Sequence, residues 1–311
     1  MAKKIVNVKD ITREEWLELR KKSLGGSDAA ASCGQSPWKS PLELYAEKKG
    51  MIADKETNES MRRGSYLEEY VALRFEEETG KKVRRDNFMY QDDELPYLTC
   101  NIDRVVVGEN TALECKTASD YIKYDIENGD IPIQYYYQLQ HYMMIMGYEY
   151  MYIAFSTNFK FVWHRVERND EFIKGMREAE TDFWVRYVEA DNPPEVDESE
   201  SSMETVRELY PGEVANTELY LPIDDLAKDY FTYQSAKKHA EDQMNFIKAK
   251  ICAELGEFER GSSDGYRVSW KTQSKSTIDS KKLMADHPDI YNKYVKTSSS
   301  RVFRINEIKK G

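Results

Sequence analysis

The sequence predicts an α+β protein with a small mixed central sheet flanked by helices. Two observations support this fold class. Short runs rich in β-branched and aromatic residues, typical of strands, occur at 99–107, 111–117, 150–155 and 160–166. Longer segments with apolar residues at every third or fourth position lie before, between and after these runs, and this spacing is typical of helices.

The expected elements follow one another along the chain. A helix at 13–20 leads into a Gly-Gly-Ser-Asp turn at which a second helix begins, and the next helices are expected at 41–49 and 65–79. The runs 99–107 and 111–117 are separated by Gly108-Glu109-Asn110 and predict a hairpin. A helix at 132–146, the strand pair 150–155 and 160–166, and a helix at 170–189 complete this part.

A boundary between two domains is expected near Pro193. The segment 191–202 contains two adjacent prolines and is otherwise acidic and serine-rich, which is typical of a linker. We therefore divide the chain into a domain at 1–193 and a C-terminal extension at 194–311. In the extension, an apolar stripe between Leu226 and Leu255 predicts a long helix that needs a partner, either within a helical hairpin or in a bundle with other copies. Two short strands, 266–270 and 301–305, are expected around a helix at 279–286.

Composition excludes several classes of protein. With 40% hydrophobic residues and 22 tyrosines the chain is too rich in large side chains to be disordered. Its four cysteines show no C-x-x-C spacing, which argues against a zinc knuckle, an iron–sulfur cluster or a disulfide framework. No signal peptide and no membrane-spanning run is visible, so we expect a cytoplasmic protein without a membrane partner.

The distribution of charge limits the kind of nucleic-acid binding that is expected. The net charge of −11 argues against a protein that coats nucleic acid indiscriminately, because such binding rests on Lys and Arg at phosphates. It is compatible with a local basic channel. The last 51 residues are basic, whereas the segment before them is acidic.

The stretch from Asp103 to Lys116 is the most informative for chemistry. In a strand, Glu114 and Lys116 share one face while Cys115 points to the other. If the turn at Gly108 has an even number of residues, Asp103 pairs across from Glu114 and both carboxylates lie on one face; an odd number separates them. A hard divalent cation is the natural compensation for clustered buried carboxylates.

The alternative for this stretch is a salt bridge on a solvated hairpin face, the usual fate of a Glu-x-Lys pair. The surrounding residues weaken that alternative because they leave little polar surface on either face of the hairpin. They are Ile102, Val105, Val106, Val107, Ala112, Leu113 and Cys115.

Three further segments carry candidate residues. Glu68 lies beside the apolar stripe of its predicted helix and can point inward, although a solvated acid is the alternative. Tyr135 and Gln138 lie three residues apart on one helix face, where a core tyrosine and a surface glutamine are the default. Arg20 and Ser27 flank a glycine turn that suits a phosphate, unless Ser27 only caps the helix.

Taken together, these segments resemble the YqaJ-type phage recombinase family, relatives of phage lambda exonuclease within the PD-(D/E)XK nuclease superfamily. The resemblance extends from Arg20 to Phe155. Its parts stand in family order: Gly-Gly-Ser-Asp-Ala-Ala at 25–30 with Ser-Pro-Trp at 36–38, Gly64 to Gly80, Asp103 with Glu-Cys-Lys at 114–116, and Tyr-Tyr-Tyr-Gln-Leu-Gln at 135–140. It implies a restriction-endonuclease-like core. The chain departs from the family pattern where Ile102-Asp103 replaces the usual Pro-Asp.

The resemblance implies roles for the candidate residues. Asp103, Glu114 and the main-chain carbonyl of Cys115 would be metal ligands, and Glu68 would serve a second ion. Lys116 would position or activate the attacking water, and Gln138 would complete the catalytic motif. Arg20 and Ser27 would hold the 5′ phosphate, with Tyr135 as a further DNA contact.

The implied activity is that of a Mg²⁺-dependent 5′→3′ exonuclease on double-stranded DNA ends, with two ions and with Mn²⁺ as a substitute. The resemblance also implies a homotrimer that works with a RecT-like single-strand annealing protein in phage-type recombination. Two alternatives stay open. One is a Cas4-like or other repair nuclease, against which the scattered cysteines count. The other is a non-catalytic adaptor for DNA ends or for the annealing protein.

Overall fold

A computed structural model of the chain describes residues 2–54, 57–118, 126, 128–157, 160–297 and 300–308. The chain divides into two compact units, Met1–Tyr210 and Pro211–Gly311, and each is described by itself. The candidate catalytic residues all belong to the first unit. Within the described ranges, none of the helices combines the length and the apolar character needed to cross a bilayer.

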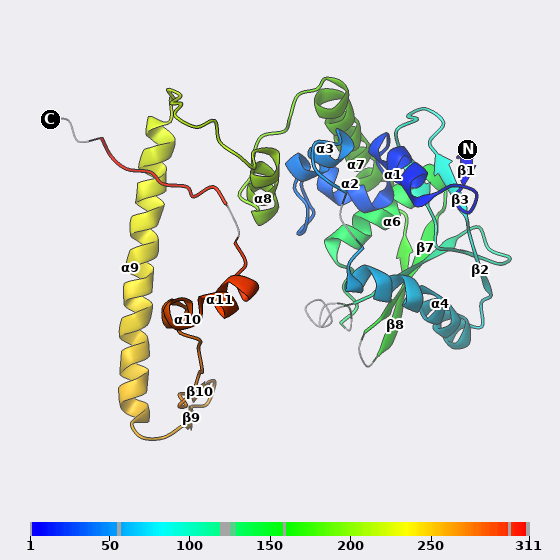
Figure 1. Cartoon of the computed structure of the whole chain (residues 1–311). Coiled ribbons are helices and arrows are strands. Elements are labelled where there is room, and N and C mark those ends of the chain that lie inside the picture. Colours follow the sequence, from blue (N-terminus) through cyan, green and yellow to red (C-terminus); the bar gives the residue numbers. More distant parts are fainter. Residues whose placement is uncertain are drawn as a thin grey trace. The chain divides into compact units, whose positions relative to one another are not determined.

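A five-stranded mixed sheet forms the centre of the first unit (Figure 1). Its strand order is β2-β5-β6-β7-β8, with β6 and β7 parallel and the other neighbours antiparallel. The strands are β2 (Val83–Arg85), β5 (Arg104–Val106), β6 (Ala112–Thr117), β7 (Tyr150–Ser156) and β8 (Phe161–Glu167). The expected α+β class with a small mixed sheet is confirmed.

A second, antiparallel sheet corrects one expectation. It consists of β1 (Lys3–Asn7), β3 (Phe88–Gln91) and β4 (Thr99–Asn101), in the order β1-β3-β4. The run 99–107 is therefore not one strand of a hairpin. The chain leaves the second sheet after Asn101, and at Arg104 it enters the central sheet, where it pairs with β6. The bend at Ile102 and Asp103 places Asp103 directly before β5.

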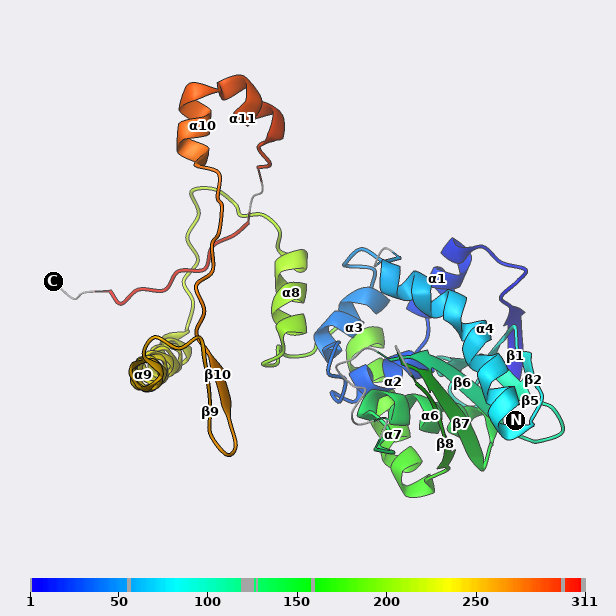
Figure 2. The same ribbon diagram turned by 90° about the horizontal axis from the view of Figure 1, so that it is seen from below.

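The central sheet is covered by one helix on each face (Figures 1 and 2). Helix α4 (Glu59–Thr79) packs Val71 and Phe75 against β6 and β7 on one face. Helix α6 (Ile133–Met146) packs Leu139 and Met143 into the larger core on the other. Further helices lie around this arrangement: α1 (Arg13–Lys21), α2 (Gly26–Ser32), α3 (Pro41–Lys48), α7 (Asp170–Phe183) with its π-helical continuation η1 (Trp184–Glu189), and α8 (Glu200–Leu209).

Alternation along β6 decides which side chains face which helix. Leu113 lies in the cluster under α4, and Cys115 packs against the same cluster. Because successive side chains of a strand point to opposite faces, Glu114 and Lys116 point toward the α6 face.

Helix α8 extends the first unit beyond the boundary expected at 193. It begins at Glu200, inside the segment 191–202 that we expected to be a linker, with Ser199 as its N-cap. Ser201 Oγ accepts a hydrogen bond of 2.9 Å from the Ser40 backbone N–H. Because α8 packs on α3 in this way, the first compact unit runs to Tyr210.

In its described residues, the second unit has one long helix, a hairpin and two short helices. These are α9 (Asp224–Leu255), β9 (Arg260–Ser262) paired with β10 (Arg267–Ser269), α10 (Ser280–Asp286) and α11 (Pro288–Tyr294). The apolar stripe of α9 is largely exposed, with Tyr233 at 75% and Met244 at 70%. The described residues 301–305 form no strand, contrary to expectation, and Lys309 and Lys310 of the basic tail lie outside the described residues.

Candidate active site

Asp103 and Glu114 line one pocket of about 340 Å³, and its other lining residues belong to β6 and α4. The ladder pairs Arg104 with Leu113, so one further step brings Asp103 beside Glu114. The turn between Val106 and Thr111 holds four residues, so it meets the even-loop condition. The Cys115 backbone N–H donates to Asp103 Oδ2 at 2.8 Å. The remaining residues of the pocket are Met61, Gly64, Ser65, Glu68, Val71, Cys115, Lys116 and Thr117.

The two oxygens of the Glu114 carboxylate have different surroundings. Glu114 is 2% exposed, and its Oε1 accepts from Lys116 Nζ at 2.6 Å and from Gln138 Nε2 at 2.7 Å. Its Oε2 is buried and has no hydrogen-bond partner among the described residues. A buried carboxylate oxygen without a partner is costly unless a cation faces it.

The charges in the pocket are strongly coupled. Burial, together with the neighbouring charge of Glu114, raises the pKa of Asp103 well above its ordinary value. Burial lowers the pKa of Lys116, but the charges of Glu114 and Asp103 outweigh burial and leave that pKa raised. Lys116 is therefore an ammonium group beside two carboxylates that repel each other. A divalent cation would relieve this repulsion, so the donor set fits a hard metal ion.

Glu68 lines the same pocket but its carboxylate is paired elsewhere. Its Oε1 accepts a hydrogen bond from Arg104 Nη1 and lies 3.2 Å from Arg85 Nη2. Within the described part of the chain, no three His, Cys, Asp or Glu side chains are gathered closely enough to hold a metal ion by themselves. The structure therefore brings Asp103 and Glu114 together and holds Glu68 at the pocket wall. Arg104, which sequence reasoning missed, is the partner that holds it there.

Helix α6 contributes three side chains to this site. Gln138 Nε2 donates to the Tyr142 hydroxyl at 2.8 Å as well as to Glu114. The Lys116 ammonium lies 5.2 Å from the centre of the Tyr135 ring, within cation–π range. Tyr142 was not among the candidates. Its position one helical turn after Gln138 is the signal that could have found it.

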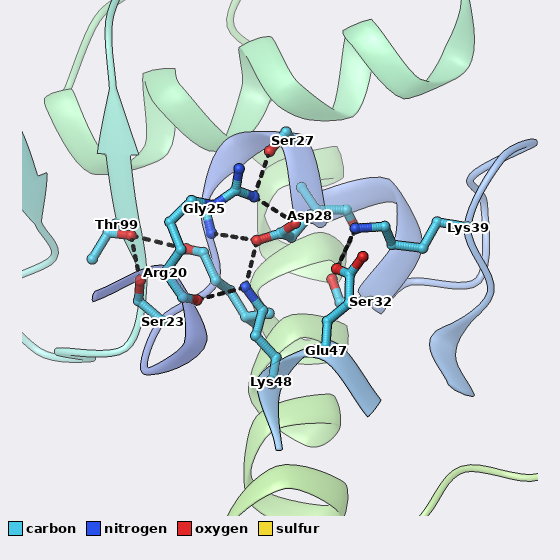
Figure 3. A network of polar contacts seen from close by, with 12 residues as sticks. Arg20, Ser23, Gly25, Ser27, Asp28, Ser32, Lys39, Glu47, Lys48 and Thr99 are labelled. Carbon is cyan, nitrogen blue, oxygen red and sulfur yellow. Dashed lines mark hydrogen bonds and ion pairs between the residues drawn. The ribbon is translucent and has the colours of Figure 1, made fainter. Parts of the chain in front are cut away.

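Arg20 and Ser27 are also brought together (Figure 3). Arg20 Nη2 donates to Ser27 Oγ at 3.0 Å and to Asp28 Oδ1 at 2.9 Å. Ser27 does not cap α2, because the N-cap is Gly25 and its N–H donates to Asp28 Oδ2 at 3.2 Å. The Arg20 side chain is 31% exposed, so it is partly open to solvent even though its Nη2 is hydrogen-bonded to Ser27 and Asp28.

Asp28 and Lys48 complete this group, and sequence reasoning missed both. Lys48 Nζ donates to Asp28 Oδ2 at 2.7 Å, although 20 residues separate the two in the sequence. Their side chains are 4% and 1% exposed. The Asp of Gly-Gly-Ser-Asp was quoted only as part of a motif, and nothing local marks Lys48 within its helix.

The fold and site together define a nuclease-type α+β protein with a carboxylate pocket suited to a divalent cation. The model of the YqaJ-like viral recombinase domain matches residues 15–149. The uncharacterized protein YqaJ of Bacillus subtilis (strain 168) is 35% identical over 309 residues, which is 96% of this chain and 96% of that protein. The chain belongs to the YqaJ-like viral recombinase family.

A solved structure shares the fold over 58% of the chain. The alkaline exonuclease LHK-Exo in complex with dAMP superposes with a TM-score of 0.50 at 21% identity, covering 58% of this chain and 94% of that chain. Another structure of that alkaline exonuclease, from Laribacter hongkongensis, gives 0.49 at 22% identity with the same coverage.

Proposed function

We propose that this chain is a phage-type exonuclease that uses Mg²⁺ to degrade the 5′-ended strand of linear double-stranded DNA. The single observation that supports this most is the pocket in which Asp103, Glu114 and Lys116 converge and one oxygen of Glu114 has no protein partner. Family membership supports a role in recombination. Degradation from the 5′ end would leave 3′ overhangs for strand annealing.

Asp103 and Glu114 would hold the metal ion, with the main-chain carbonyl of Cys115 as a further oxygen ligand. Mg²⁺ prefers one or two carboxylates and keeps positions for water and substrate phosphate, which suits this pair. When bound, the ion would polarise the scissile phosphate and lower the pKa of the attacking water. Mn²⁺ has similar ligand preferences and should substitute.

Side chains in and beside the pocket would assist the hydrolysis. Lys116 would hold the water in line with the phosphorus atom and place positive charge where negative charge develops. As the water oxygen bonds to phosphorus, the bond to the leaving 3′ oxygen breaks and that oxygen takes up a proton. Gln138 would keep Glu114 in place, and Tyr135 would limit the movement of Lys116.

Arg20 and Ser27 would bind the 5′ phosphate of the strand being degraded. A guanidinium is well suited to bidentate contact with phosphate oxygens, and a hydroxyl adds a third hydrogen bond. Cleavage on the 3′-oxygen side leaves a phosphate on the new 5′ end. Each cycle would therefore regenerate the terminus that this pair binds.

A second ion would need Glu68 to change partners. Its carboxylate is shared between Arg104 and Arg85 in this structure. We propose that incoming DNA phosphates compete for these arginines and free Glu68 for a second ion.

By family resemblance we propose a homotrimer that hands its product strand to a RecT-like annealing protein. The exposed apolar stripe of α9 in the second unit supports an assembly role for that unit. Light scattering of the purified protein would give three times the chain mass; a monomer would refute the trimer.

Polarity and end preference can be tested in one experiment. Linear duplexes with a label at either the 5′ or the 3′ end, and with a 5′ phosphate or a 5′ hydroxyl, are digested in Mg²⁺. We expect the 5′-ended strand to shorten and the phosphorylated end to be preferred. Shortening from the 3′ end would overturn the polarity, and equal digestion of both ends would remove the phosphate role of Arg20 and Ser27.

A further inference from the structure

We propose that Lys48 is a positioning residue for Arg20 that acts through Asp28, and that Lys48 and Asp28 thereby set the preference of Arg20 for a phosphorylated DNA end. This inference rests on the proposed function, because it concerns the residues that would bind the 5′ phosphate. Lys48 would orient the Arg20 guanidinium and offset part of the negative charge of Asp28, so that the guanidinium attracts phosphate more strongly. Lys48 itself would not contact the DNA.

Lys48 holds Arg20 at two points (Figure 3). Its ammonium donates to Asp28 Oδ2 at 2.7 Å and to the main-chain carbonyl of Arg20 at 2.8 Å. The buried Lys48 thus fixes the Asp28 carboxylate, which accepts a hydrogen bond from the Arg20 guanidinium, and also fixes the main chain of Arg20. Helix α3 brings this lysine to the junction between α1 and α2.

The geometry of Asp28 determines where the guanidinium points. Its Oδ1 accepts from Arg20 Nη2, while its Oδ2 accepts from the Gly25 N–H and from Lys48. The same Nη2 also donates to Ser27. Within the described ranges, the side-chain hydrogen bonds of Arg20 come from Nη2, so Nε and Nη1 are left for an anion.

The charge balance of the cluster favours an anion. Burial would raise the pKa of Asp28, but Arg20 and Lys48 outweigh it and hold that pKa well below its ordinary value, so Asp28 is ionised. Lys39 and Glu47, the next charged pair, neutralise each other. Burial lowers the pKa of Lys48, and the charge and hydrogen bond of Asp28 oppose this shift. With Lys48 as an ammonium group, two cations share one carboxylate and the cluster keeps one positive charge. Without Lys48, the charge of Asp28 would be matched by Arg20 alone and the attraction for phosphate would fall.

If Lys48 only stabilised the packing of α3, its substitution would change the affinities for phosphorylated and hydroxyl DNA ends equally. A positioning residue affects the phosphorylated end selectively. The ratio of the two affinities therefore separates the two roles, and a measurement without divalent cations keeps catalysis out of the comparison.

The test uses fluorescence anisotropy of labelled duplexes with a 5′ phosphate or a 5′ hydroxyl in EDTA. Wild-type protein, Lys48→Met and a control, Lys49→Met, are compared. Lys49 is the next residue and pairs at the surface with Asp191 at 2.8 Å. We expect a preference for the phosphate of about tenfold in wild type and in Lys49→Met, which corresponds to about 1.4 kcal/mol. In Lys48→Met the ratio should fall close to one.

If wild type discriminates and Lys48→Met discriminates equally, this inference is overturned while the phosphate role of Arg20 stands. If wild type binds both ends equally, the phosphate role fails and this inference fails with it. Should Lys48→Met not fold, the double variant Asp28→Asn/Lys48→Met removes one buried charge of each sign and takes its place. The double variant keeps one positive charge, on Arg20, but lacks the groups that orient the guanidinium, so we expect it to lose the preference; retention of the preference would contradict the positioning role.

A kinetic readout on the double variant completes the test. With saturating Mg²⁺, a positioning role should raise KM for phosphorylated duplex and leave kcat for the hydroxyl end near that of wild type. An equal drop of kcat on both substrates would indicate a structural role and overturn the proposal.

Discussion

Gln138 on α6 and Glu114 on β6 are joined by a hydrogen bond of 2.7 Å from the amide nitrogen to Oε1. Because the same amide also donates to Tyr142, it has a single position, and it fixes which oxygen of Glu114 is satisfied by protein. The other oxygen, Oε2, is thereby left without a hydrogen-bond partner among the described residues, as the proposed metal site requires.

Gln138→Ala should therefore weaken metal binding and not only slow the reaction. Loss of a residue that orients a metal ligand typically lowers metal affinity or activity by about 10- to 100-fold. The Mg²⁺ concentration at half-maximal nuclease rate would rise accordingly, whereas Gln134→Ala, on the same helix, would leave it unchanged. An unaltered Mg²⁺ requirement in Gln138→Ala would exclude this role.

Asp103→Asn should stabilise the metal-free protein while it abolishes activity. Burial and the charge of Glu114 raise the pKa of Asp103, so its ionised form opposes folding at neutral pH. Neutralising it should add about 1 kcal/mol to the free energy of unfolding in EDTA. Urea unfolding with and without Mg²⁺ measures this, and the gain should shrink or reverse when Mg²⁺ is present. A destabilised variant in EDTA would show that the two carboxylates do not repel each other.

Gly26→Ala should disturb the contact between the two functional clusters. A Cβ on Gly26 would lie 2.3 Å from the Tyr142 ring, which must then shift together with the hydroxyl that Gln138 reaches. We expect a loss of about 1–3 kcal/mol in stability. Gly175→Ala on α7 is the matched control, since its Cβ would meet nothing within 4 Å, and it should stabilise by about 0.5–1 kcal/mol. Equal effects of the two substitutions would contradict the close packing.

His141 should make stability depend on pH. Both ring nitrogens face acceptors, Glu180 Oε1 at 2.7 Å and the Thr99 carbonyl at 2.9 Å, so the imidazolium form is favoured. Burial lowers the pKa of His141, but Glu180 outweighs burial and leaves the pKa above its ordinary 6.5. The stabilisation is then complete below about pH 6.5 and is lost as pH rises through the raised pKa.

The difference in unfolding free energy between wild type and His141→Gln reports this contribution. It should be about 3 kcal/mol at pH 6 and clearly smaller at pH 9. A difference that stays constant over this range would mean that His141 is neutral in the folded protein.

The sequence alone predicted that Asp103, Glu114 and Lys116 lie together, because their placement depends on local periodicity. Alternation in β6 places Glu114 and Lys116 on one face, and the even turn between Val106 and Thr111 places Asp103 beside them. Both rules act over a few residues, so one sequence suffices to apply them.

The residues that sequence analysis missed are fixed by tertiary contacts. Lys48 meets Asp28 only because α3 packs beside α2, and Arg104 meets Glu68 only because α4 crosses the sheet. The split of the run 99–107 has the same origin, since which sheet a strand joins depends on partners far along the chain. Residues paired in this way have no regular separation in the sequence, so no sequence pattern predicts the pair.

The central claim is that Asp103 and Glu114 hold a divalent cation that is needed to hydrolyse DNA. The most direct measurement is the rate of digestion of end-labelled linear duplex as Mg²⁺ is titrated, for wild type, Asp103→Asn, Lys116→Met and the exposed control Lys82→Met. We predict no digestion in EDTA. In Mg²⁺ we predict that the rate falls by about 10²-fold or more in Asp103→Asn and in Lys116→Met and stays at the wild-type value in Lys82→Met. Full activity of Asp103→Asn, or digestion by the wild type in EDTA, would contradict the claim.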